Sequence, residues 1–308
     1  MHKLIENQVR ISVRNLVEFI LRSGDIDNRH STKAQYDAMQ IGSRLHRKIQ
    51  GSMPGTYKAE VSLKHTAHYR DVEILLEGRA DGIITPDEKS VREEQANLFY
   101  QAKTDENVSA EISFIIDEIK VIRQDMEKLD SAAQVHIAQA LCYAYMYARA
   151  LNTKAAGVTE ENTRLCIGIQ ITYCHPETEE IKRFLKVYTF EEIKEDFDHY
   201  ISEYGKWAQF LYEHRLERNA SVQKLSFPYP YRAGQKRLVA AAYRTMINGE
   251  QLFIQAPTGI GKTLSTVFPA VWAVGEEYAD KIFYLTAKTI TRTAAVSAFD
   301  ILRENGLK

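Results

Sequence analysis

The sequence is poor in cysteine and proline, and its net charge is close to zero. Its 308 residues include 3 cysteines and 7 prolines, and 40 basic against 41 acidic side chains give a formal net charge of −1. Cys142, Cys166 and Cys174 form no CxxC spacing, which argues against a disulfide framework or a zinc knuckle and favours reduced thiols. The near-zero charge means that any site for a polyanion must be local.

Long apolar runs are also missing. No run approaches the roughly 20 residues of a membrane span, and the first residues, MHKLIENQVR, lack the apolar core of a signal peptide. We therefore expect no membrane partner and a cytoplasmic location. Hydrophobic residues make up 44% and charged residues 26% of the chain, which is the balance of a globular protein.

Apolar periodicity predicts two α/β domains, over residues 1–218 and 224–308, the second one short. The polar segment ERNASVQ (217–223) is the predicted linker, and the polar stretch 85–111 is predicted to be a loop or an insertion. In the first domain we expect helices over 9–21, 32–50, 131–151 and 191–216, and strands over 57–65, 72–80, 112–122, 165–173 and 181–188. The second is predicted to run helix, strand, P-loop, helix, strand.

A phosphate-binding loop is predicted in the second domain. The stretch LFIQAPTGIGKTLSTVFPAVWAV reads as a strand, a glycine-containing loop and an amphipathic helix, which is the context that a P-loop requires. Backbone N–H groups of the loop, Thr258 included, and the helix N-terminus would form an anion cradle. Gly259 and Gly261 allow close approach of phosphate. Lys262 can reach the β- and γ-phosphates, and the hydroxyl of Thr263 can bind Mg²⁺.

Polar residues on both sides of this loop suit a nucleic-acid motor. Upstream, Arg232 and Gln235 stand at the start of a predicted helix, and a glutamine amide can pair with both polar edges of adenine. Downstream, a predicted strand leads into a loop whose Lys288, Thr289 and Arg292 can hold a phosphate backbone.

In this order, the three blocks resemble the start of a superfamily 2 helicase of the XPD/DinG type, from Phe227 onward. The resemblance implies a RecA-like domain, ATP and Mg²⁺ as cofactors and DNA as partner. Such helicases carry later motifs, a second RecA-like domain and often an iron–sulfur cluster held by four cysteines, none of which follows here. We therefore expect an amino-terminal fragment of a longer helicase, with any such cluster outside it. The fragment is expected to bind nucleotide weakly and not to turn it over.

The predicted strand IIDEIKVI carries the most informative pair of the first domain. Glu118 and Lys120 are two residues apart and so share one face of a strand. Charges among isoleucines cost desolvation unless something uses them, although a simple salt bridge is the alternative reading. Four further polar residues accompany the pair in a fixed order on predicted helices and strands: His46, Asp81, Gln139 and Tyr143.

This order resembles the RecB-type branch of the PD-(D/E)XK nucleases, over roughly 41–148. The resemblance implies a mixed sheet flanked by helices, with Asp81 and Glu118 as ligands of one or two Mg²⁺ or Mn²⁺ ions. Hard oxygen ligands suit these ions. His46 would add a nitrogen ligand, and the Ile119 carbonyl a further oxygen.

The same resemblance assigns roles to the remaining residues. Lys120 would hold the attacking water or stabilise the transition state. Gln139 and Tyr143, four apart on one helix face, would position the site and the DNA backbone.

Two features depart from the pattern. RecB-type relatives often carry a cysteine cluster that binds an iron–sulfur cluster, which the three scattered cysteines do not supply. The gap between Asp81 and Glu118 is long for neighbouring strands, so Asp71 and Asp87 are alternatives to Asp81. Asp117 is less suited because it should face away from Glu118.

The sequence thus predicts a DNA helicase fused to a metal-dependent deoxyribonuclease that acts in DNA processing or repair. The first alternative is a DNA-binding loading module with a degenerate nuclease fold. A P-loop enzyme of small-molecule metabolism is a further alternative, against which the residues that flank the loop argue.

Overall fold

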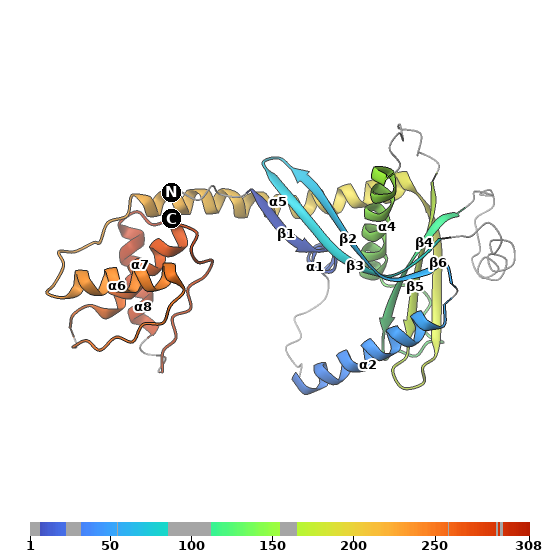
Figure 1. The fold of residues 1–308 in the computed structure, drawn as a ribbon, viewed down its shortest axis with the longest axis horizontal. Coiled ribbons are helices and arrows are strands. Elements are labelled where there is room, and N and C mark those ends of the chain that lie inside the picture. Colours follow the sequence, from blue (N-terminus) through green and yellow to red (C-terminus); the bar gives the residue numbers. More distant parts are fainter. Residues whose placement is uncertain are drawn as a thin grey trace. The chain divides into compact units, whose positions relative to one another are not determined.

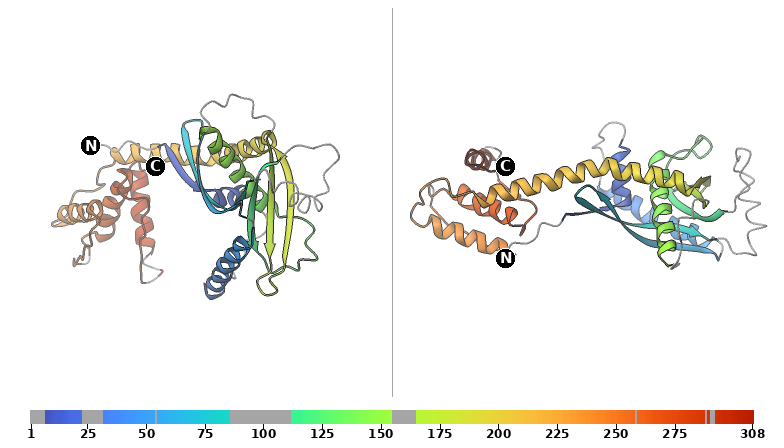
Figure 2. Two further views of the ribbon diagram at one scale, coloured as in Figure 1. Left: turned by 45° about the vertical axis from the view of Figure 1, so that its right-hand side comes forward. Right: turned by 90° about the horizontal axis from the view of Figure 1, so that it is seen from above.

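The computed structural model describes residues 7–22, 32–53, 55–85, 112–154, 165–257, 259–287, 289 and 292–308. The chain divides into two compact units, one of residues 8–208 and the other mainly of residues 209–308. Figures 1 and 2 show the helices and strands of both units.

The first unit is built on one mixed sheet of six strands, and the predicted α/β class with a mixed sheet flanked by helices is confirmed. The strand order is β1-β3-β4-β5-β6, with β2 on the other edge of β3. Pairs β1/β3 and β4/β5 are parallel, and the other pairs are antiparallel. The strands are β1 (Gln8–Ser12), β2 (Tyr57–Tyr69), β3 (Val72–Ile84), β4 (Ile112–Val121), β5 (Cys166–Cys174) and β6 (Ile181–Thr189).

Four helices accompany this sheet: α1 (Val13–Ile20), α2 (Thr32–Gly51), α4 (Gln134–Lys154) and α5 (Phe190–Gln223), the last of which continues into the second unit. Helix α4 packs across β4 and β5 (Figures 1 and 2). Strand β5 is buried along its whole length and β4 along most of it. Central strands covered on both faces tolerate few polar side chains, so a buried charge on β4 is an exception that needs a cause.

The sheet forks at one edge of β3. Strand β1 pairs with Glu73–Glu77 of β3, whereas β4 pairs with Gly82–Ile84 on the same edge. Residues 78–81 lie between these two pairings. A Cβ at Gly78 would lie 2.5 Å from Cε1 of Tyr143, so the tyrosine ring from α4 rests directly on bare backbone at the fork. A glycine is required there because a side chain would displace the ring.

The predicted helix over 9–21 is wrong in its first part. Residues 8–12 form β1, and α1 begins only at Val13. Ser12 ends the strand as a helix N-cap, its Oγ accepting a hydrogen bond from the Asn15 N–H at 3.1 Å. Pairing with β3 outweighs the helical spacing of the apolar residues, because an open sheet edge supplies hydrogen bonds that spacing alone does not reveal.

The predicted linker at 217–223 is also wrong, because these residues form the last turns of α5. Asn219 and Val222 are buried at 3% and 1% exposure. Val222 belongs to the apolar core of the second unit, and Asn219 Nδ2 donates to Glu277 Oε1 at 3.1 Å. The polar composition conceals two buried positions three residues apart on one helix face. The two-domain division itself stays a prediction.

The second unit contains the end of α5 and three further helices, α6 (Gln235–Asn248), α7 (Lys262–Gly275) and α8 (Arg292–Glu304). The two strands predicted here, around 252–255 and 281–286, are wrong, since no described residue of this unit lies in a strand. Phe253, Phe283 and Leu285 are 94%, 80% and 89% exposed. An apolar run shows a capacity for burial, but a strand also needs a paired neighbour, which the described residues do not provide.

One prediction from composition agrees with the structure. Cys142, Cys166 and Cys174 are free and buried. Within the described ranges, none of the helices combines the length and the apolar character that crossing a membrane would require.

Candidate functional site

The fork in the sheet brings together all six residues predicted for the nuclease site. They come from four elements that are separated in sequence, namely α2, β3, β4 and α4. Side-chain contacts, together with the hydrogen bond from the Ile119 N–H to Asp81, link them into one group: His46, Asp81, Glu118, Lys120, Gln139 and Tyr143.

Asp81 stands where the hydrogen-bond ladder between β3 and β4 stops. The ladder ends at the pair Gly82 and Asp117. Beyond it, Asp81 Oδ2 accepts a hydrogen bond from the Ile119 N–H of β4 at 2.8 Å. His46 Nδ1 lies 3.5 Å from Asp81 Oδ1, and Gln50 Nε2 donates to the Asp81 carbonyl at 2.9 Å. The carboxylate therefore reaches β4 in spite of the long sequence gap.

The two alternatives to Asp81 gain no support. Asp71 precedes β3, at the end of the strand remote from Glu118. Asp87 and the stretch 86–111 lie outside the described residues.

Glu118 is a carboxyl group that is 1% exposed. Lys120 Nζ lies 2.7 Å from its Oε1, whereas its Oε2 is buried and has no hydrogen-bond partner. Burial raises the pKa of Glu118 to about 8, against the opposing effect of the Lys120 ammonium group, and the Asp81 charge raises it further. A metal-free Glu118 therefore holds a proton at neutral pH, and a bound cation would displace it.

Lys120 is held between Glu118 and α4. Its Nζ also donates to Gln139 Oε1 at 3.2 Å, and Gln139 Nε2 donates to the Tyr143 hydroxyl at 3.4 Å. Burial and the nearby Glu118 charge both raise the pKa of Tyr143, so its phenol stays protonated. This row of contacts from α4 keeps the ammonium group beside the buried carboxyl.

Asp117 faces the opposite side of β4, as predicted. Its carboxylate accepts hydrogen bonds from Thr172 Oγ1 at 2.5 Å, Gln170 Nε2 at 3.0 Å and the Tyr57 hydroxyl at 3.2 Å. Burial raises its pKa, and these three donors oppose that rise. Asp117 is thus a satisfied polar group of the interior and not a member of the site with Glu118.

The residues present fit a metal ion that is shared with substrate, and not one enclosed by protein ligands. No three His, Cys, Asp or Glu side chains in the described ranges are arranged to hold a metal by themselves. Magnesium usually takes one or two carboxylates and completes its shell with water and substrate phosphate. The unpartnered Glu118 Oε2 and the Asp81 carboxylate, with His46 beside it, offer such a partial ligand set.

Sequence reasoning missed His136, which stands one turn before Gln139 on α4. Its Nδ1 lies 2.8 Å from the hydroxyl of Tyr173. The sequence does place His136 near the site, because His136, Gln139 and Tyr143 are spaced i, i+3 and i+7 and therefore share a helix face.

The second unit places the predicted adenine-reading residues against the P-loop. The Arg232 N–H donates to Gln235 Oε1 at 2.9 Å, and the Arg232 guanidinium donates to the Gly259 carbonyl. Gly259 and Gly261 have φ angles of +85° and +81°. A Cβ at Gly261 would also lie 2.7 Å from Gln235 Nε2, so glycine is required by both conformation and space.

The N-terminal turn of α7 carries the lysine and threonine of the loop. Lys262 Nζ donates to the carbonyl oxygens of Ala256 and Pro257 at 2.8 and 3.0 Å, so the ammonium group folds back over the loop. Thr263 is the second residue of α7. Thr258 lies outside the described residues, and the nucleotide roles stay predictions.

The residues predicted to contact DNA are only partly described. Thr289 and Arg292 are exposed, and Arg292 begins α8. Lys288 lies outside the described residues.

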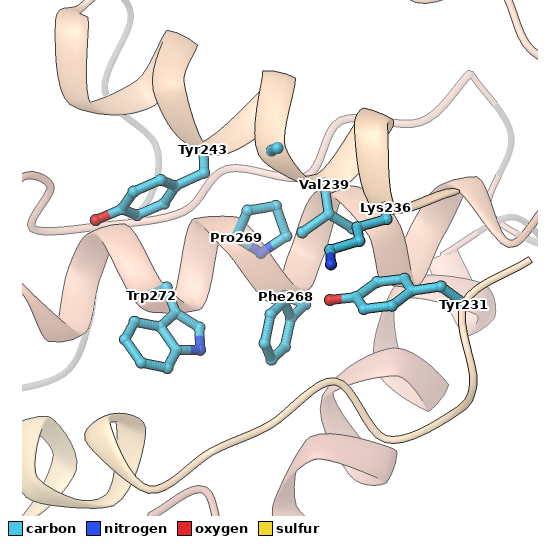
Figure 3. Close-up of a pocket in the computed structure, with 8 residues that line it drawn as sticks. Tyr231, Lys236, Val239, Tyr243, Phe268, Pro269 and Trp272 are labelled. Carbon is cyan, nitrogen blue, oxygen red and sulfur yellow. The ribbon is translucent and has the colours of Figure 1, made fainter. Parts of the chain in front are cut away.

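A hollow of about 240 Å³ lies between α6 and α7 (Figure 3). None of the described P-loop residues lines it, and neither Arg232 nor Gln235 is among its lining residues. The hollow is therefore separate from the predicted nucleotide site. It is lined by Tyr231, Lys236, Val239, Ala240, Tyr243, Phe268, Pro269 and Trp272.

Comparison with known proteins gives a partial match to a helicase. No family model matches the chain. The chain is 34% identical over 83 residues to the probable ATP-dependent helicase MJ0942 of Methanocaldococcus jannaschii. This match covers 27% of the chain and only 12% of that helicase. The crystal structure of SSO0001 aligns with 65% of this chain and 77% of its own, at 16% identity and a TM-score of 0.35.

Proposed function

We propose that the first unit is a metal-dependent deoxyribonuclease joined to the start of a DinG/XPD-type ATP-dependent DNA helicase, and that the protein acts in DNA processing or repair. One observation carries the nuclease half. Glu118 is buried, its Oε2 has no partner, and it lies beside Lys120 and the strand that Asp81 contacts. A buried carboxyl with a free oxygen is costly in a folding role and is suited to a cation.

In this proposal Asp81 and Glu118 would hold Mg²⁺ or Mn²⁺, with His46 beside Asp81. Such a cation lowers the pKa of a bound water and neutralises phosphate charge. The protein's own contribution is orientation. The hydrogen bond to Gln139 holds the Lys120 ammonium group beside Glu118. Its positive charge would there stabilise the negative charge that the attacked phosphate gains in the transition state.

The test is cleavage of 5′-labelled single-stranded and duplex DNA in Mn²⁺ and in Mg²⁺. We compare the wild type with Glu118→Gln, which keeps the shape of the side chain, and with Glu177→Gln, which changes an exposed glutamate on the β5–β6 turn. Cleavage should vanish in the first variant and persist in the second. Equal cleavage by wild type and Glu118→Gln would reject this site.

A second function, DNA binding without cleavage, is favoured by two observations. The metal-free Glu118 holds its proton at neutral pH, and three protein ligands do not converge in the described ranges. A loading module would bind labelled DNA without cutting it at any pH from 6 to 9. A nuclease would gain activity as pH rises toward about 8, because metal then competes less with the proton on Glu118.

The helicase half is supported by the P-loop geometry and by the partial similarity to a probable ATP-dependent helicase. The chain should bind ATP. Lys262→Ala should remove this binding, whereas Lys236→Ala, on the neighbouring helix but outside the loop, should leave it unchanged. Equal ATP affinity in both variants would show that the P-loop is not the nucleotide site.

A further inference from the structure

His136 lies on the face of α4 that also carries Gln139 and Tyr143, and its imidazole contacts the hydroxyl of Tyr173. Tyr173 is buried, at 1% exposure. Its hydroxyl oxygen accepts a hydrogen bond from the Ala133 N–H at 2.9 Å and lies 2.8 Å from His136 Nδ1. Its own proton needs an acceptor, since a buried hydroxyl proton without one is costly.

His136 Nδ1 is the acceptor that the structure offers. If Nδ1 carried a proton, the Tyr173 hydroxyl would accept twice and its proton would have no partner among the described contacts. Tyr173 therefore donates to Nδ1, and the neutral imidazole carries its proton on Nε2. The Nε2–H makes no hydrogen bond within the described ranges, and the side chain is only partly buried.

The charged groups around His136 keep it neutral. Burial lowers the pKa of His136 to about 4, helped by the positive charges of Lys120 on β4 and Arg14 on α1, and opposed by Glu18 on α1. From β5 it contacts Tyr173, which is uncharged. The imidazole is therefore an uncharged N–H donor throughout the neutral range.

Two cations near this donor make an anion the fitting ligand. Lys120 contacts Glu118 and Gln139, and Arg14 interacts electrostatically with Glu118, so both lie at the fork. A phosphodiester brings oxygens that accept hydrogen bonds and a negative charge that the two cations attract.

We propose that His136 is a phosphate-positioning residue, which donates from Nε2 to a non-bridging oxygen of the bound DNA strand while Tyr173 fixes its tautomer. This inference rests on the proposed DNA-processing function of the first unit. It adds a hydrogen-bond donor that lies outside the predicted set of site residues.

The first measurement needs no catalysis. Wild-type protein labelled with ¹⁵N in histidine is compared with His136→Gln by two-dimensional NMR, which assigns the His136 ring. The expected spectrum shows protonated Nε2 and unprotonated Nδ1 unchanged from pH 5.5 to 8. A proton on Nδ1, or titration in this range, would overturn the inference.

The second measurement is the affinity for a labelled DNA strand in Ca²⁺, used as a divalent ion that permits binding to be followed without turnover. His136→Ala should weaken binding on the order of tenfold, as expected for one hydrogen bond to a charged group. His136→Gln retains an N–H donor and should recover most of the affinity, and Tyr173→Phe should lie between. His199→Ala, which removes an exposed histidine on α5, is the matched control.

The outcomes separate this inference from the nuclease proposal. Wild-type affinity in His136→Ala overturns the inference, whatever the cleavage result. Tenfold weaker binding with recovery by glutamine supports it even if the wild type does not cut DNA. Absence of DNA binding by the wild type would overturn both.

Discussion

Replacement of Glu118 by glutamine should stabilise the metal-free protein, and the gain should grow with pH. The folded-state pKa of Glu118 is raised from 4.5 to about 8, so the folded protein keeps a proton that the unfolded chain releases above pH 4.5. For a group of this kind, stability falls as pH rises between these two values. Glutamine has nothing to ionise and avoids the loss.

The expected gain is about 3 kcal/mol at pH 7 and below about 1 kcal/mol at pH 5, from 1.36 kcal/mol per pKa unit. These values already include the opposing effect of the Lys120 ammonium group on the pKa of Glu118. Glu177→Gln, at an exposed position, should show no such dependence.

Urea unfolding without metal measures this difference. The chain has two tryptophans, Trp207 in the first unit and Trp272 in the second, so a Trp272→Phe background makes fluorescence report on the first unit. The reasoning would be refuted if the free energy of unfolding of Glu118→Gln differed from that of its parent by the same amount at pH 5 and at pH 7. Added Mn²⁺ should stabilise the parent and not the variant.

Three further predictions concern other parts of the molecule. Asp81→Asn should lower cleavage at least hundredfold, because it removes a charged ligand, and an initial-rate assay that finds a smaller loss would argue against Asp81 as a ligand. Thr172→Val should destabilise the fold by about 1–3 kcal/mol in urea, because Asp117 loses its shortest hydrogen bond, while cleavage persists. Gly261→Ala should weaken ATP binding about tenfold or more, because its φ of +81° and the Gln235 amide exclude a side chain; unchanged affinity in equilibrium titration would contradict the cradle.

The residues predicted for the nuclease site could be inferred from sequence because each stands on an element with a clear period. The i, i+2 spacing of Glu118 and Lys120 predicts a shared strand face, and the i, i+4 spacing of Gln139 and Tyr143 predicts a shared helix face. The structure agrees with both spacings. Their proximity to Asp81 was an inference from order alone, because helix and strand periods carry no information across the long stretch between Asp81 and Glu118.

The errors share a cause. Residues 8–12 look helical by spacing, 217–223 look like a linker by polarity, and Phe253 and Phe283 look like strand residues by hydrophobicity. In each case the outcome depends on whether a distant segment supplies a pairing edge or a covering surface. Such a partner is a property of the folded chain and leaves no local mark.

The sequence by itself determined the chemistry of this protein: the glycine-containing loop with its lysine, the carboxylates and the cation beside them. These follow from residue type and short-range spacing, which the covalent chain sets. Only the tertiary structure decided which groups are buried and which groups from distant segments contact one another. Packing of α4 against the forked sheet produces three such features: the buried Glu118 oxygen without a partner, the hydrogen bond from β4 to Asp81, and the contact between His136 and Tyr173. They depend on the tertiary structure because burial and hydrogen-bond partnership arise from contacts between distant segments.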